Sequence, residues 1–178
     1  LVDFSEERRK FVKSLYPSIN VSANGDDIFN DPSIDAVIIA TPAETHYELA
    51  IKCLEAGKHI LVEKPMAKSV SEVRKIRELA IEKNLVAMVG HTFLYNSAVR
   101  YIKKLISSNE LGKIRYIFSQ RLNLGRIRSD VDALWNLAPH DISIIQYWLG
   151  EPEPINISRN GKAFIQENID DVVFMNIE

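Results

Sequence analysis

The sequence contains one cysteine, Cys53, among its 178 residues. A single cysteine forms no internal disulfide, which fits a reducing compartment, and we therefore expect a cytoplasmic protein. Cys53 lies in an apolar helical pattern, and this predicts a buried, unreactive thiol rather than a nucleophile. We expect no bound metal, because none of the four histidines is spaced as a ligand pair with another histidine or with Cys53.

The chain also lacks an excess of charge and any long apolar run. Its net charge is −2, whereas proteins that bind nucleic acid normally carry a basic surface, so we expect no nucleic-acid partner. No apolar run approaches the roughly 20 residues that a membrane helix needs, so we expect no membrane partner either. With 46% hydrophobic and 26% charged residues, the composition is that of an ordinary globular protein.

The two ends lack the features of a complete chain. Residue 1 is leucine rather than methionine, and the chain stops at residues 176–178 in the middle of an alternating pattern typical of a strand. We expect a segment of a longer protein, with residues missing from both ends.

The first half alternates apolar runs with helical patterns. The runs at 35–40, 59–62 and 85–90 are short and continuous, which is typical of strands covered on both faces. Capping residues and apolar spacing predict helices at 6–15, 45–56 and from 70 onward. This alternation predicts an α/β fold with a doubly wound parallel sheet.

The pattern changes after Gly90. The expected elements are a helix over 97–107, an alternating strand over 113–122, a helix over 140–149 that ends at Gly150, and strands from 155 onward. This order is typical of an α+β domain with a mostly antiparallel, open sheet. We therefore predict two domains, residues 1–91 and residues 92–178, each of them incomplete.

Three predicted strands end on polar or proline-containing stretches, which are Asp3, Thr41-Pro42 and Glu63-Lys64-Pro65. In open parallel sheets the carboxyl ends of the strands lie at one edge, where ligands bind. A carboxylate such as Asp3 accepts hydrogen bonds from ribose hydroxyls and repels a 2′-phosphate. The arrangement therefore predicts a dinucleotide crevice that prefers NAD to NADP. The alternative is that Asp3 only opens a loop or caps the next helix.

The stretch after the run at 35–40 offers a second cofactor contact. The Thr41 hydroxyl and nearby amides can face a phosphate or a ribose, while Pro42 fixes the chain. The alternative is an ordinary strand-to-helix turn. His46, in the first turn of the following helix, is more typical of a surface residue than of a ligand.

Lys64 is the strongest candidate for chemistry. An ammonium at the mouth of an apolar crevice can hydrogen-bond a substrate hydroxyl and help to transfer its proton. Glu63 can accept ribose hydroxyls or pair with a neighbouring cation. Pro65 would fix the direction of Lys64, and we predict a cis Lys64–Pro65 bond. The alternative is a solvated loop with an adjacent ion pair.

A second candidate, His140, begins a predicted helix in the other domain. The positive end of the helix dipole favours a neutral imidazole, which is a candidate acid or base. Asp141, which follows it, is interpreted as a helix-start residue. The alternative is that His140 is itself a cap or a surface residue.

Three strings carry a family resemblance over essentially the whole chain: IIATPAETHYELAIKCLEAGKHILVEKPMAKSVSEV, MVGHTFLYNSAVRYIKKLI and LAPHDISIIQYWLG. They resemble the glucose–fructose oxidoreductase / inositol dehydrogenase (Gfo/Idh/MocA) family of NAD(P)-dependent sugar oxidoreductases. The resemblance implies a Rossmann domain followed by an α/β domain whose open sheet forms homodimers or homotetramers.

The same resemblance implies roles for individual residues. Lys64 resembles the family's catalytic lysine and His140 its catalytic histidine, both in contact with substrate. The positions that match the family's cofactor-binding residues are Asp3, Thr41, Pro42, His46, Glu63, Lys64 and Pro65. Many members have an aspartate where this chain has Asn136, an amide that can orient a substrate or the imidazole but cannot accept a proton.

The stretch RLNLGRIRSDVDALWNLAPHD resembles members that oxidise the 3-hydroxyl of a UDP-N-acetylhexosamine. Arg121, Arg126 and Arg128 would then bind a diphosphate or a uronate, the alternative being a solvated, charged loop. We therefore expect an NAD-dependent oxidoreductase that oxidises a secondary hydroxyl of a sugar or nucleotide sugar. A non-catalytic NAD-binding sensor or scaffold on the same fold is the alternative function.

Overall fold

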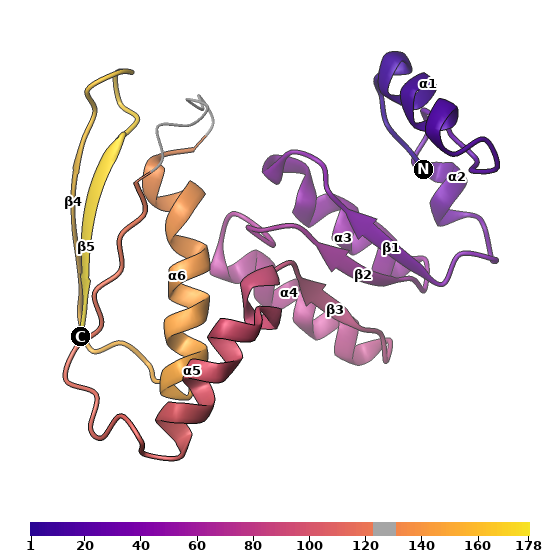
Figure 1. The fold of residues 1–178 in the computed structure, drawn as a ribbon. Coiled ribbons are helices and arrows are strands. Elements are labelled where there is room, and N and C mark those ends of the chain that lie inside the picture. The colour runs from indigo at the N-terminus through magenta and orange to yellow at the C-terminus, as the bar shows by residue number, and fades with distance from the viewer. Residues whose placement is uncertain (123–130) are drawn as a thin grey trace. The chain divides into compact units, whose positions relative to one another are not determined.

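The computed structural model describes residues 1–122 and 131–178. The chain forms two compact units, Leu1–Gly90 and His91–Glu178 (Figure 1). Both units contain helices and strands. Within the described residues, no helix has both the length and the apolar character needed to cross a bilayer.

The first unit is built on a parallel sheet of three strands in the order β1-β2-β3. These strands are β1 (Ala36–Ile39), β2 (His59–Val62) and β3 (Ala87–Val89). Ile39 pairs with Val62 and Val62 pairs with Val89, so the strands end level at their carboxyl ends. The predicted parallel sheet is confirmed, and its carboxyl edge carries several of the candidate residues.

Two helices, α3 (His46–Glu55) and α4 (Val70–Glu82), connect the strands and pack against one another and against the sheet. A short 3-10 turn, η1 (Ala43–Thr45), leads into α3. The start of α4 is fixed locally, because the Ser69 hydroxyl accepts a hydrogen bond from the Glu72 amide at 3.2 Å. The range of α3 matches the prediction to within one residue at each end, and α4 begins at the predicted residue.

The core of this unit lies between the sheet and these helices. Its largest fully buried side chains are those of Leu54, Ile76, His46, Val62 and Cys53. Burying each large aliphatic side chain contributes on the order of 1.5–3 kcal/mol. Cys53 is 1% exposed, so its predicted burial is confirmed, and this burial raises the pKa of its thiol to about 11.

The residues before β1 form α1 (Glu6–Leu15) and α2 (Asp26–Phe29). The Ser5 hydroxyl accepts a hydrogen bond from the Arg8 amide at 3.2 Å, so α1 begins where the capping pattern predicts. The strand expected to end at Asp3 is reduced to one parallel bridge between Val2 and Ser22. A strand needs a longer ladder than a single pair provides.

The second unit combines helices with an antiparallel hairpin. Its elements are η2 (Thr92–Tyr95), α5 (Ser97–Ser107), α6 (Ala133–Leu149), β4 (Ile157–Lys162) and β5 (Val172–Ile177). The antiparallel pairing of β4 with β5 and the range of α5 are confirmed predictions. The indole N–H of Trp148 donates to the Val99 carbonyl at 2.9 Å and joins α6 to α5.

The strand predicted over 113–122 is wrong. The segment belongs to neither of the two sheets in the described residues. Tyr116 and Phe118 within it are 83% and 78% exposed. Alternation of apolar and polar residues does not suffice for a strand, because the backbone also needs a neighbouring strand to pair with.

The helix predicted over 140–149 begins earlier, at Ala133, so His140 lies in its middle. Asp132 fixes the start, because its Oδ1 accepts a hydrogen bond from the Trp135 amide at 2.8 Å. Pro139 lies inside the helix although proline is usually a helix boundary, which explains the misplaced start. The prediction that His140 faces the positive end of a helix dipole is therefore wrong. The predicted end at Gly150, with φ +82°, is confirmed.

Candidate active site

The carboxyl ends of β1, β2 and β3 lie side by side. The ladder continues one residue past the strands, because the Glu63 amide donates to the Ile39 carbonyl at 2.9 Å and the Gly90 amide to the Val62 carbonyl at 2.8 Å. Gly90 also approaches Glu63 closely, since a Cβ atom there would stand 3.3 Å from Glu63 Oε1. The sheet therefore holds Glu63 in a fixed place at the end of its central strand.

Lys64 follows Glu63 and is half-buried. Its backbone amide donates to Glu63 Oε2 at 3.3 Å. Its peptide bond to Pro65 is cis, which confirms the predicted isomer. An ammonium at this edge carries three donors, with which it can hold a substrate oxygen and assist proton transfer.

His46 is only 1% exposed, at the start of α3. Its Nδ1 atom lies 2.7 Å from the Pro65 carbonyl oxygen, and its Nε2 atom lies 2.8 Å from the Thr41 carbonyl oxygen. The predicted surface position is therefore wrong. Both ring nitrogens face main-chain oxygens, so His46 joins the turn after β1 to the turn after β2. The cofactor contact that the family resemblance implies for His46 stays a prediction.

The turn after β1 leaves Thr41 and Pro42 exposed. The Thr41 and Thr45 hydroxyl oxygens lie 2.6 Å apart, and the Thr45 hydroxyl donates to the Pro42 carbonyl at 2.8 Å. Because the Thr45 hydrogen is used in this way, the Thr41 hydroxyl donates to Thr45 and keeps acceptor capacity on its own oxygen. Thr41 can therefore accept a hydrogen bond from a ligand at this edge.

Asp3 organises the start of α1. Its Oδ1 accepts a hydrogen bond from the Ser5 amide at 2.8 Å, and its Oδ2 lies 3.8 Å from Arg8 Nη1. The Arg9 guanidinium donates to the Asp3 carbonyl oxygen. The turn-forming role that the sequence offers as an alternative is thus present, and the carboxylate still has lone pairs for other donors.

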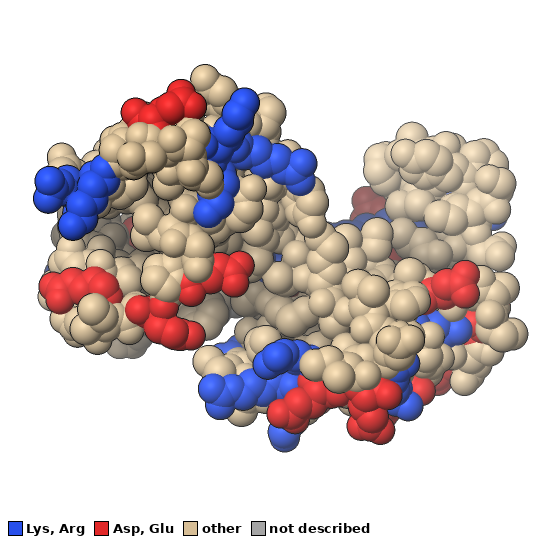
Figure 2. Space-filling model, turned by 90° about the horizontal axis from the view of Figure 1, so that it is seen from below, with Lys and Arg blue, Asp and Glu red and all other residues tan. Residues whose placement is uncertain are grey.

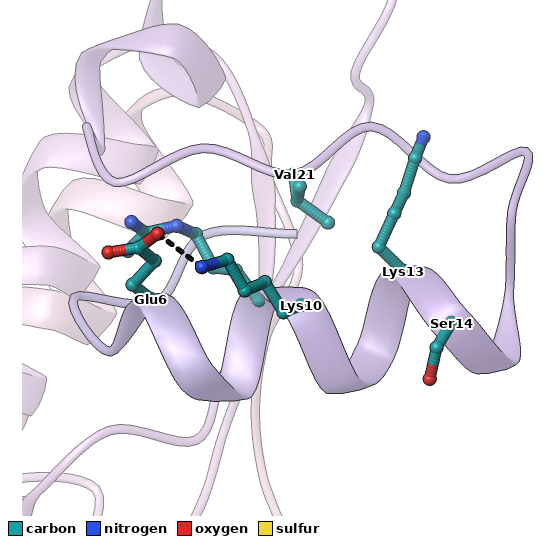
Figure 3. A pocket seen from close by; sticks show the side chains of 6 residues that line it. Glu6, Lys10, Lys13, Ser14 and Val21 are labelled. Atoms are coloured by element: carbon teal, nitrogen blue, oxygen red, sulfur yellow. Dashed lines mark ion pairs between the residues drawn. The ribbon is translucent and has the colours of Figure 1, made fainter.

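A hollow of about 420 Å³ lies along α1 (Figure 3). It is lined by Glu6, Arg9, Lys10, Lys13, Ser14 and Val21. Lys10 Nζ lies 2.7 Å from Glu6 Oε1, and Lys13 Nζ donates to the Ile19 carbonyl at 2.7 Å. Because these cations have protein partners, the hollow is a weaker candidate for a site than the strand ends.

In the second unit, His140 lies beside an aromatic ring. The Phe93 and His140 rings meet edge to face, with centroids 4.9 Å apart and planes at 65°. The Arg121 guanidinium carbon stands 5.0 Å from the Phe93 centroid, and Arg121 Nε lies 2.7 Å from Asp141 Oδ2. Asn136 lies one helical turn before His140 and therefore on the same side of α6.

This cluster differs from the sequence-based expectation in two residues. Asp141 lies inside α6 and pairs with Arg121, so its interpretation as a helix-start residue is wrong. Phe93 was not predicted, and no signal in a single sequence identifies it. Arg121 directs its charge to Asp141, whereas Arg126 and Arg128 lie outside the described residues.

The described residues contain no group of three or more His, Cys, Asp or Glu side chains that could hold a metal ion. On the face drawn in Figure 2, acidic and basic side chains are mixed. Lys64 at the strand ends and His140 on α6 stay the predicted candidates for proton transfer, beside the titratable Glu63 and Asp141.

Comparison with known proteins places these residues in context. A family model described as an oxidoreductase family with an NAD-binding Rossmann fold matches residues 1–91. The chain is 35% identical over 128 residues to scyllo-inositol 2-dehydrogenase (NADP(+)) from Bacillus subtilis, with 72% of this chain and 35% of that protein covered. It is 31% identical over 138 residues to UDP-N-acetylglucosamine 3-dehydrogenase from Acidithiobacillus ferrooxidans, with 77% and 42% covered.

A solved dehydrogenase structure is also similar to this chain. Levoglucosan dehydrogenase in complex with NADH and levoglucosan is similar to this chain with a TM-score of 0.83 and 27% identity, over 99% of this chain and 53% of that one. The chain thus spans about a third to a half of the length of the relatives it matches, since the covered shares are 35%, 42% and 53%.

Proposed function

The chain belongs to the oxidoreductase family with the NAD-binding Rossmann fold, and we propose that the natural polypeptide containing it oxidises a secondary hydroxyl of a sugar with NAD. One observation carries the proposal. Glu63, Lys64 and Pro65 follow the central strand of a parallel sheet, at the edge where such sheets bind their ligands. The relatives named as dehydrogenases of an inositol and of a UDP-amino sugar support this substrate class.

At this edge we assign Thr41 and Pro42 to the phosphate side of a dinucleotide and Glu63 to its nicotinamide ribose. Asp3 lies outside the three-stranded sheet, and we assign it to the adenosine ribose on the family resemblance alone. Thr41 offers an acceptor oxygen, and the exposed Glu63 carboxylate accepts hydroxyl donors. NAD, when bound, supplies the hydride acceptor.

Asp3 supports a preference for NAD over NADP, because its carboxylate repels a 2′-phosphate. Similar proteins are named with both cofactors, one as an NADP(+) enzyme and another in complex with NADH, so the preference of this chain needs its own measurement. Calorimetric titration of NAD and of NADP into the natural polypeptide measures this preference as the difference between the two affinities. Replacing Asp3 by asparagine should reduce the difference between the two affinities, and a preference for NADP in the unmodified protein would contradict the assignment.

Lys64 and His140 are the proposed catalytic residues. The Lys64 ammonium holds and polarises the substrate hydroxyl, and His140 takes or relays its proton. Asn136, one turn before His140, orients the substrate or the imidazole. In this proposal residues 1–91 bind the cofactor and residues 92–178 supply the substrate-binding groups.

Substitution of the two catalytic residues tests this proposal. Lys64→Ala and His140→Ala should each reduce turnover at least ~10²-fold, the usual size of a general acid–base contribution. Lys52→Ala, which removes an exposed lysine from α3, is the matched control and should leave turnover unchanged. Near-normal turnover in both catalytic variants would overturn the mechanism.

The finer proposal for the substrate is the 3-hydroxyl of a UDP-N-acetylhexosamine. A relative named as UDP-N-acetylglucosamine 3-dehydrogenase supports it, as do the arginines in the stretch before α6. Because Arg121 is paired with Asp141, Arg126 and Arg128 are the better candidates for the diphosphate. Incubation with NAD and a panel of free sugars, inositols and UDP-sugars identifies the substrate by NADH formation.

A non-catalytic NAD-binding sensor or scaffold is the second candidate. The observation that favours it is Asn136, since an amide cannot accept a proton where many family members have a carboxylate. A sensor would bind NAD and form no NADH with any member of the panel. If the protein instead forms NADH with one compound of the panel, and the Lys64→Ala variant does not, the protein is an enzyme.

We also propose a cytoplasmic homodimer or homotetramer formed through the sheet of the second unit. Strand β5 exposes Val172 and Phe174, two apolar side chains that lie two residues apart and therefore on one face of the hairpin. Exposed apolar surface of this kind marks interaction sites. Analytical ultracentrifugation of the natural polypeptide and of its Phe174→Ser variant tests the assembly, which should weaken in the variant.

A further inference from the structure

His46 occupies an unusual place for a polar side chain. It is 1% exposed, and both of its ring nitrogens lie against main-chain carbonyl oxygens at 2.7 and 2.8 Å. One of these carbonyls belongs to Thr41, two residues after β1. The other belongs to Pro65, the residue directly after Lys64. The ring thus bridges the turns that follow the first two strands of the sheet.

A carbonyl oxygen only accepts hydrogen bonds, so the imidazole must be the donor. The neutral ring carries one N–H and holds one of the two carbonyls, whereas the doubly protonated ring holds both. A buried imidazole without these bonds would cost several kcal/mol, so an apolar side chain would fill the same space more favourably. The polar ring therefore has a role that filling the core does not explain.

We propose that His46 is a positioning residue for Lys64. By holding the Pro65 carbonyl against the Thr41 turn, it fixes the backbone on the carboxyl side of Lys64 and with it the direction of the ammonium. His46 does not touch the substrate or the cofactor in this role. The effect on turnover rests on the proposed function, in which Lys64 is catalytic, whereas the effect on the order of the turn does not.

Amide hydrogen exchange in the natural polypeptide tests the structural half of the proposal. His46→Phe keeps a ring of similar shape and removes both nitrogens. Exchange in peptides covering residues 63–68 should accelerate about fivefold to tenfold, the effect of losing one or two hydrogen bonds. Exchange in the middle of α4 should not change, whereas unchanged exchange at 63–68 would overturn the proposal.

Two further variants separate local from global effects. Ile76→Val removes a buried methyl group from α4 and lowers stability without touching the turn, so it should leave exchange at 63–68 unchanged. His46→Gln can still donate to one carbonyl, and it should give an intermediate exchange rate. If His46→Phe does not fold, His46→Gln is used in its place. Amide exchange in His46→Gln that is as slow as in the unmodified protein, both at residues 63–68 and in α4, would then overturn the proposal.

A double-mutant cycle tests the catalytic half. His46→Phe should lower kcat by up to about 10²-fold, the loss expected when a catalytic group is misplaced by about 1 Å. In a Lys64→Ala background the same change should have almost no further effect on kcat, because the residue it positions is gone. If the two substitutions instead reduce kcat by independent factors that multiply, His46 has a general structural role and the proposed positioning of Lys64 is refuted.

The two experiments distinguish the failure of this inference from the failure of the proposed function. If Lys64→Ala retains normal turnover, the proposed mechanism is wrong, but exchange at 63–68 still decides whether His46 orders the turn. If Lys64→Ala is inactive and His46→Phe has normal kcat, the proposed function stands and the positioning role is refuted.

Discussion

The backbone of Gly90 lies against the carboxylate of Glu63, so that a Cβ atom on Gly90 would stand 3.3 Å from Glu63 Oε1. Gly90 and Glu63 directly follow β3 and β2, and both are held by the continuing ladder. The glycine leaves room for the carboxylate rather than serving a left-handed backbone, since its φ is not among the positive values. The edge of the sheet therefore fixes where the Glu63 carboxylate can lie.

Gly90→Ala should weaken NAD binding. The added methyl group displaces the Glu63 carboxylate by a few tenths of an ångström and impairs its proposed bond to the nicotinamide ribose. We expect an increase in Kd of about threefold to tenfold, which corresponds to the loss of one ordinary hydrogen bond. Isothermal titration of NAD into the natural polypeptide measures it, and an unchanged Kd would contradict the assignment of Glu63.

Gly57→Ala is the matched control, because it separates backbone strain from contact. Gly57 has φ +75° and a Cβ there would meet nothing within 4 Å. Placing alanine in this left-handed conformation should reduce the free energy of unfolding by about 1–2 kcal/mol, measured by urea denaturation. The Kd for NAD should stay the same, so the two glycines should affect different quantities.

Helix starts that depend on neighbouring residues are predictable from the sequence. Ser5 and Ser69 each accept a hydrogen bond from an amide three residues later, and α1 and α4 begin accordingly. The start of α6 carries the same local cap, since Asp132 accepts a hydrogen bond from the Trp135 amide, but it was missed because Pro139 inside the helix resembles a helix boundary. The hydrogen bond from the Ala133 amide to the Asp170 carbonyl joins residues far apart in the chain, and local patterns do not contain such pairings.

The same distinction applies to the candidate site. The Glu63-Lys64-Pro65 turn directly follows an apolar strand, and for this reason its place at the sheet edge could be predicted. The role of His46 could not, because one of its partners lies 19 residues away. Likewise, Asp141 and Arg121 are separated by 20 residues, and only the fold brings them together.

Arg159 should stabilise the second unit through two carboxylates. Its Nη2 lies 3.2 Å from Oδ2 of Asp132, the residue that caps α6, and it also pairs with Asp170. Because the arginine is partly exposed, Arg159→Ala should reduce the free energy of unfolding by only about 0.5–1 kcal/mol. Thermal unfolding measures the loss, with Lys162→Ala, an exposed neighbour on β4, as the control.

Gly161→Ala should have a larger effect than Arg159→Ala. A Cβ atom on Gly161 would overlap the Asp170 carboxylate, which must then move away from Arg159. We expect a loss of about 1–3 kcal/mol, as for other overpacked sites. A Gly161→Ala protein as stable as the unmodified one would show that Asp170 moves freely and that the pair contributes little.

Cys53 should react slowly with iodoacetamide in the folded protein. The thiol is buried, and burial raises its pKa to about 11, so the reactive thiolate is scarce at neutral pH. Unfolding in guanidinium chloride exposes the thiol and returns its pKa toward the usual value. Mass spectrometry of the alkylated protein should therefore show a large acceleration on unfolding, and fast alkylation of the native protein would contradict the buried position.

His91 should make the protein less stable at mildly acidic pH. Burial lowers the pKa of its imidazole below the usual 6.5. Its Nδ1 has no hydrogen-bond partner among the described residues. Between the lowered folded pKa and the unfolded value, the unfolded chain binds more protons, so the free energy of unfolding falls as pH falls through this window.

Thermal unfolding between about pH 7.5 and about pH 5 tests this dependence on His91. In His91→Phe, which cannot bind a proton, the decrease in Tm over this range should be smaller than in the unmodified protein. Ile76→Val should shift the whole Tm curve downward in parallel, because a lost methyl group has no pH dependence. If His91→Phe and the unmodified protein lose the same number of degrees toward acidic pH, the dependence comes from other groups and the burial of His91 does not control it.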